Sequence, residues 1–83
     1  MTTLSNPEQR APGAPIGLLL REVVDAREFL AVARTRGRPD LTRRARSILC
    51  DALTVYTQAL TQRALPVPYA VRDELRLLQH VPW

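Results

Sequence analysis

The sequence predicts an all-α fold, a long antiparallel helical hairpin plus a short third helix that resembles a three-helix bundle. Two observations lead to this prediction. Apolar residues recur at spacings of three and four along most of the chain, which is typical of amphipathic helices. No segment alternates between apolar and polar residues as a half-buried strand does. With 83 residues, the chain is expected to form a single domain with a modest core.

Residues 1–14 contain Pro7, Pro12 and Gly13 among small polar residues and show no hydrophobic period. This composition is typical of a disordered arm. We therefore expect the helical domain to cover residues 15–83.

The first helix is predicted over residues 15–36. Pro15 suits a first helical turn, where its missing N–H costs nothing. Gly37 and Pro39 end the helix, since glycine accepts left-handed backbone angles and proline disfavours helix in the residue before it. Its apolar seam comprises Ile16, Leu19, Val23, Ala26, Leu30 and Ala33.

The second helix is predicted over residues 40–64, with Asp40 as its N-cap. About half of its circumference is apolar. Pro66 and Pro68 then interrupt the chain before a short third helix over residues 68–80.

Both long helices carry more apolar surface than one neighbouring helix can cover, which predicts association with a second copy or another protein. Arg27 projects into the apolar arc of the first helix, so it must reach solvent or meet a carboxylate across an interface. The alternative is a compact monomer whose third helix covers both grooves of the hairpin. The predicted interface residues are Leu19, Leu20, Val24, Arg27, Phe29, Leu53, Tyr56 and Leu60.

The charge of the chain is concentrated in one short stretch, residues 34–46. Its six arginines and single aspartate give it a net charge of +5, whereas the whole chain carries +4. The hairpin brings these arginines to one end, where they are predicted to bind an anionic partner. The arginines are Arg34, Arg36, Arg38, Arg43, Arg44 and Arg46.

This pattern favours a small protein–protein interaction module, such as an adaptor, a chaperone-like subunit or a regulator, whose arginine end engages an acidic protein surface. The alternative is a nucleic-acid-binding accessory protein that contacts phosphates through the same cluster. No aromatic residue lies among the arginines, so a stacking platform for single strands is not indicated. A helix-turn-helix is disfavoured because the second helix is long and has a wide apolar face.

Catalytic chemistry has few candidate residues here. His80 is the only histidine and lies near the chain end, and Cys50 lies mid-helix beside Asp51, where nothing activates a thiol. We therefore expect no enzyme activity, no metal site and no cofactor. The single cysteine, the absence of a secretory signal and the short apolar runs predict a cytoplasmic protein without membrane contact.

Overall fold

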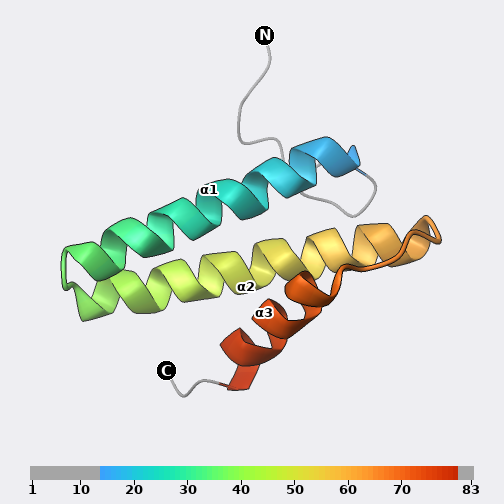
Figure 1. Ribbon diagram of the computed structural model, residues 1–83. Coiled ribbons are helices and arrows are strands. Elements are labelled where there is room, and N and C mark those ends of the chain that lie inside the picture. The colour runs from blue at the N-terminus through green and yellow to red at the C-terminus, as the bar shows by residue number, and fades with distance from the viewer. Residues whose placement is uncertain (1–13, 81–83) are drawn as a thin grey trace, which may run out of the picture.

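The computed structural model describes residues 14–80, which form three helices and contain no strand. They are α1 (Ile16–Thr35), α2 (Pro39–Gln62) and α3 (Tyr69–His80) (Figure 1). The all-α hairpin predicted from the sequence is confirmed. The predicted disordered arm falls on residues 1–14, of which only Ala14 belongs to the described part of the chain.

Helices α1 and α2 lie side by side and run in opposite directions (Figure 1). Their contact is a continuous seam, because apolar residues three and four apart share one face of each helix. Several of these residues are alanines, which allow two helix backbones to approach closely, while the buried leucines each contribute about 1.5 to 3 kcal/mol. The buried seam consists of Leu19, Val23, Ala26, Leu30, Ala33, Ala45, Leu49, Leu53, Tyr56, Ala59 and Leu60.

The turn between α1 and α2 depends on a left-handed glycine. Gly37 has φ of 63°, and its N–H donates to the carbonyl of Arg34 at 3.1 Å, while the N–H of Arg38 donates to that of Ala33 at 3.4 Å. These two hydrogen bonds form a Schellman motif, which satisfies carbonyls left open at the end of α1.

The start of α2 differs from the prediction. Arg38, in an extended conformation, occupies the N-cap, the helix begins at Pro39, and Asp40 lies inside the first turn. Asp40 is therefore not the N-cap. The reason is that the fixed φ of proline and its missing N–H suit the first helical position.

The end of α2 repeats the Schellman motif with an alanine. Ala64 has φ of 56°, and the N–H of Leu65 donates to the carbonyl of Leu60 at 2.8 Å. The helix thus ends at Gln62, two residues before the predicted boundary. An L-residue in this conformation is strained, because its Cβ crowds the neighbouring carbonyl.

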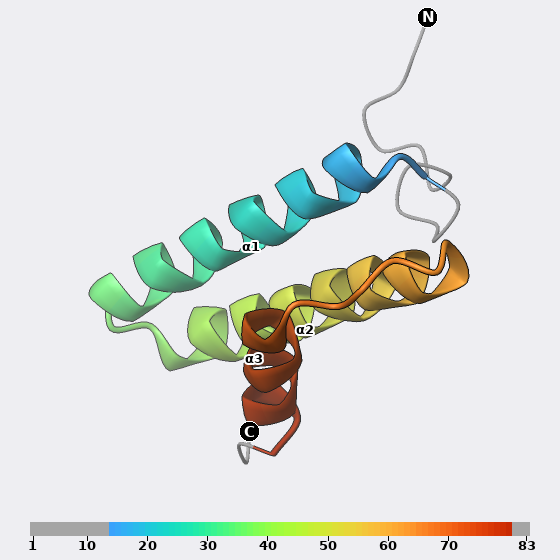
Figure 2. The same cartoon turned by 45° about the vertical axis from the view of Figure 1, so that its right-hand side comes forward.

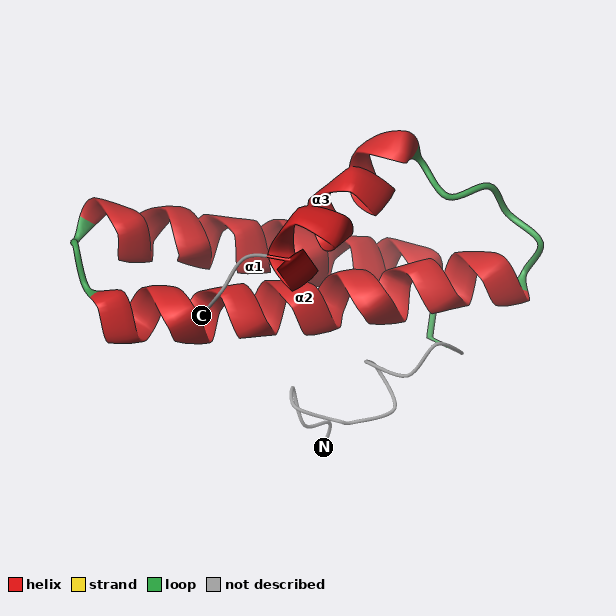
Figure 3. Ribbon diagram, turned by 90° about the horizontal axis from the view of Figure 1, so that it is seen from below, coloured by secondary structure: helices red, strands yellow, loops and turns green. Residues whose placement is uncertain are grey.

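Helix α3 crosses the hairpin at a steep angle rather than lying along it (Figures 2 and 3). It contacts mainly α2, and Val71 and Leu78 are its buried residues, with Leu75 packed partly against the same core. Arg27 of α1 also reaches α3, through an ion pair with Glu74. Helix α3 therefore covers one face of the hairpin, not both of its grooves.

Candidate anion-binding site at the hairpin end

The arginine-rich end of the hairpin contains a shallow depression of about 380 Å³. Three arginines line it, one from the last turns of α1 and two from the first turns of α2. The antiparallel hairpin brings these turns together, and the spacing between Arg43 and Arg46 places them one turn apart on α2. The lining residues are Arg34, Gly37, Pro39, Thr42, Arg43 and Arg46.

The electrostatic environment differs between the two helices. Arg34 lies in the last turn of α1, where the helix dipole favours a cation. Arg43 and Arg46 lie in the second and third turns of α2, beyond the first turn in which the dipole of that helix acts strongly. The helix dipole therefore favours Arg34 at its position and has little effect on the other two arginines.

The other three predicted arginines lie elsewhere on the same end. Arg38 is ion-paired with Asp40 at 3.5 Å. Hydrogen bonding from the Arg38 side chain, and secondly from the backbone N–H of Leu41, lowers the pKa of the Asp40 carboxyl. Arg36 and Arg44 are exposed and do not line the depression. Successive residues of a helix are about 100° apart around its axis. Arg36 therefore projects from the face opposite to Arg34 on α1, and Arg44 from the face opposite to Arg46 on α2. The structure thus divides the cluster between two faces.

The depression has the chemistry of a site for an oxyanion. Guanidinium groups present N–H donors in planar pairs that match carboxylate and phosphate oxygens. Thr42 adds a hydroxyl, and no acidic or aromatic side chain lines the depression. Bases therefore have no surface to stack on, while carboxylates and phosphates have cationic donors.

The predicted interface residues divide into three groups. Leu19, Leu53, Tyr56 and Leu60 are buried in the core of the chain itself, so they are covered without a partner. Leu20 and Val24 remain 41% and 49% exposed on one flank of α1. Phe29 remains 37% exposed on the other flank.

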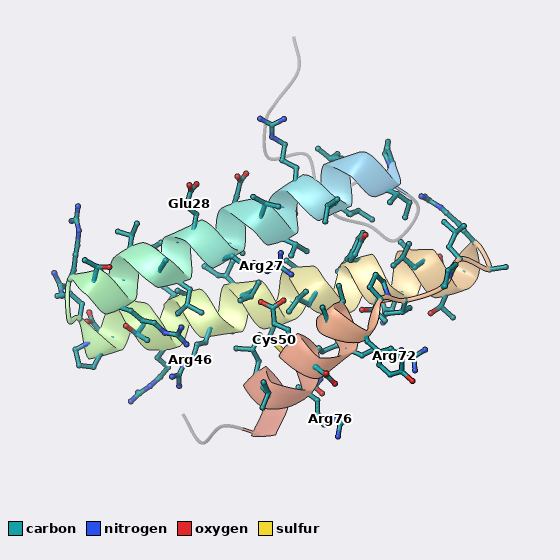
Figure 4. All side chains as sticks on the ribbon, viewed as in Figure 1. Arg27, Glu28, Arg46, Cys50, Arg72 and Arg76 are labelled. Atoms are coloured by element: carbon teal, nitrogen blue, oxygen red, sulfur yellow. The ribbon has the colours of Figure 1, made fainter. Side chains whose placement is uncertain are left out.

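Arg27 was predicted to reach solvent or to meet a carboxylate across an interface; it instead meets a carboxylate of the same chain. Its guanidinium extends toward α3 (Figure 4) and donates three hydrogen bonds to Glu74, the shortest at 2.6 Å. The hydrogen bonding to Glu74 raises the pKa of Arg27 above its already high value. This ion pair attaches α3 to α1.

A second depression, of about 350 Å³, lies on the face of the hairpin opposite to α3 and was not predicted from the sequence. Six apolar side chains and three carboxylates line it. The signal was present in the sequence, since Asp25 and Phe29, like Ile48 and Asp51, are three or four residues apart and so share a face. The lining residues are Leu19, Glu22, Asp25, Ala26, Phe29, Ile48, Asp51, Ala52 and Val55.

The remaining candidates for chemistry do not form a site in the described part of the chain. Cys50 is half-buried, and its pKa is raised by burial and secondly by the charge of Asp51. Within residues 14–80, no cluster of His, Cys, Asp and Glu side chains is arranged to hold a metal ion. The side chain of His80 lies outside the described structure. None of the three described helices is both long and apolar enough to cross a bilayer.

No protein-family model, curated protein or solved structure matches this chain.

Proposed function

We propose that this protein is a small helical protein–protein interaction module, without catalytic activity, whose arginine-rich hairpin end binds an acidic surface of its partner. The observation that carries this proposal is the convergence of Arg34, Arg43 and Arg46 on one depression from two different helices. An anion bound in this depression would offset the repulsion among the three cations. A reducing, cytoplasmic location is part of the proposal, because the one cysteine is a half-buried thiol.

An acidic protein is favoured over nucleic acid as the partner. The depression lacks the aromatic platform on which the bases of single strands stack. Carboxylates spaced along one turn of a partner helix would reach all three arginines at once. Nucleic-acid binding through the same arginines is the competing outcome of the experiment below.

The test is a titration of the protein with a fluorescent peptide rich in glutamate and aspartate and, separately, with labelled mixed-sequence duplex DNA. Both titrations are repeated from about 50 to 200 mM salt. The triple variant Arg34→Gln/Arg43→Gln/Arg46→Gln removes the three cations of the depression. The matched control is Arg21→Gln/Arg72→Gln/Arg76→Gln, which removes the same charge from exposed positions elsewhere on α1 and α3; Arg72 and Arg76 point away from the hairpin (Figure 4).

We expect the wild type to bind the peptide and the triple variant to lose at least about tenfold in affinity, since charged hydrogen bonds contribute about 1.5 to 3 kcal/mol each. The control should lose far less. Equal losses in both variants would mean that net charge alone attracts the peptide, which contradicts a defined site. Binding of DNA with a steep salt dependence, in the absence of peptide binding, would establish the nucleic-acid function instead.

A further inference from the structure

The face of the hairpin opposite to α3 carries an uncovered apolar strip. Phe29 and Val32 of α1 are 37% and 46% exposed, and Ile48 of α2 is 42% exposed. Phe29 and Ile48 line the same depression, so they lie at neighbouring levels along the hairpin. Three large apolar side chains thus lie partly exposed on one face of the hairpin, and what they suggest depends on the charges around them.

The charges on this face follow a fixed order along each helix. On α1, Asp25, Phe29, Val32 and Arg36 occur at intervals of four, three and four residues and therefore share a face. On α2, Arg44, Ile48, Asp51 and Val55 occur at the same intervals. In both helices the arginine lies nearer the hairpin turn and the aspartate lies farther from it, with apolar residues between them.

From this order we propose that the partner on this face is a second copy of the chain, packed antiparallel in a symmetric dimer. The inference rests on the proposed function as an interaction module and names one partner and one surface for it. In this dimer the twofold axis lies in the plane of the contact, runs perpendicular to the helices and passes beside Ile48. Helix α1 of one copy then packs antiparallel on α1 of the other, and α2 on α2. Arg44 of each copy would then face Asp51 of the other, since the two residues lie about 5 Å on either side of Ile48.

The same twofold axis would also bring opposite charges of the two α1 helices together. Arg36 of one copy would lie over the acidic turn of the other copy, which carries Asp25 and Glu22. Phe29 would lie near the axis, so the apolar strips of the two copies would cover one another. The dimer would thus bury apolar surface at its centre and pair opposite charges around it.

Charge order also excludes the other symmetric arrangement. If the twofold axis ran along the helices, α1 of one copy would lie on α2 of the other at equal distances from the turn. Asp25 would then face Asp51, with which it lines one depression, and Arg36 would approach Arg44. Like charges would meet at both places, which disfavours this arrangement.

The test measures dimerisation by sedimentation equilibrium for the full chain and for charge-reversal variants. Arg44→Asp alone and Asp51→Arg alone should each weaken dimerisation at least about tenfold, because each places like charges together twice across the axis. The double variant Arg44→Asp/Asp51→Arg restores opposite charges and should dimerise within about threefold of the wild type. Circular dichroism of each variant checks that these exposed substitutions leave the helices folded.

Two further variants test the position of the axis. In a Cys50→Ala background, Ile48→Cys should form a disulfide-linked dimer under mild oxidation, because the axis passes beside residue 48 in both copies. Val24→Cys, on the uncovered flank of α1, should not.

The proposal is overturned if the wild type remains a monomer at all concentrations. It is also overturned if Arg44→Asp strengthens the dimer, which would indicate the axis along the helices, or if the double variant stays as weak as the single ones. These outcomes are distinct from failure of the proposed function. Binding of the acidic peptide depends on Arg34, Arg43 and Arg46, which lie outside this face, so a monomer that binds the peptide would contradict the dimer alone.

Discussion

Arg27 of α1 and Glu74 of α3, 47 residues apart, are joined by three hydrogen bonds from one guanidinium to one carboxylate. The side chains are 42% and 28% exposed, so the ion pair lies at the edge of the core rather than inside it. It is the contact through which α3 reaches α1, because the apolar residues of α3 pack mainly on α2.

Replacing Glu74 by glutamine should loosen α3 without unfolding the hairpin. We expect a loss of up to about 1 kcal/mol, since partly exposed ion pairs contribute little to global stability. Hydrogen exchange should accelerate in residues 69–80 and remain nearly unchanged in α1 and α2. Asp73→Asn is the matched control, because Asp73 pairs at 3.7 Å with Arg76 inside α3. Equal acceleration in both variants would show that Arg27 does not hold α3.

The two Schellman motifs allow a paired prediction with opposite signs. Gly37→Ala should lower the free energy of unfolding by about 1 kcal/mol, and Ala64→Gly should raise it by a similar amount. Both residues have positive φ, and a Cβ added at Gly37 would meet no atom within 4 Å, so backbone conformation alone decides the effect. Urea denaturation measures both changes. Destabilisation by Ala64→Gly would show that φ at residue 64 is not positive in solution.

Shortening a buried side chain in the seam between α1 and α2 should lower the stability of the fold. Leu49 is 2% exposed, and Leu49→Ala should lower the free energy of unfolding by about 2 to 5 kcal/mol. The control is Leu77→Ala on α3, where the side chain is 66% exposed and the loss should stay below about 0.5 kcal/mol. Urea unfolding followed by circular dichroism compares the two variants, and similar losses would contradict the assignment of the core.

Cys50 should react slowly with iodoacetamide near neutral pH, because burial and then the Asp51 carboxylate raise the pKa of its thiol. A raised pKa in the folded state means that the neutral thiol contributes stability below the pKa of the unfolded chain. This contribution is lost as the pH rises through the folded pKa. Asp51→Asn should shift the reaction profile to lower pH, whereas Glu28→Gln, at a position that points away from α2, should not (Figure 4). Reaction of the folded protein as fast as that of the urea-unfolded chain would contradict this prediction.

The helices could be predicted from the sequence because their apolar spacing and their proline and glycine residues act locally. The start of α2 was placed wrongly because Pro39 can either end one helix or begin the next, and the prediction used only its first role. The pairing of Arg27 with Glu74 could not be predicted, since it depends on the angle at which α3 crosses the hairpin. Tertiary packing alone sets that angle.

The division of the arginines could have been found from the sequence. Arg34 and Arg36 are two residues apart and hence about 200° apart around α1, and Arg44 and Arg46 stand in the same relation on α2. Treating the six as one cluster at the hairpin end hid this alternation. The opposite depression was also missed: its residues share a face of each helix in the sequence, but Asp25 and Asp51 come together only when the two helices are paired.

The guanidinium of Arg63, just past the end of α2, donates a hydrogen bond of 2.5 Å to the carbonyl of Ala14, just before α1. This contact closes the end of the hairpin that lies away from the turn. The 20 residues of α1 separate it from the arginines by about 30 Å. The two ends of the hairpin are therefore separate attachment points, and a small ligand held by the arginines would leave the end with the Ala14–Arg63 contact uncovered.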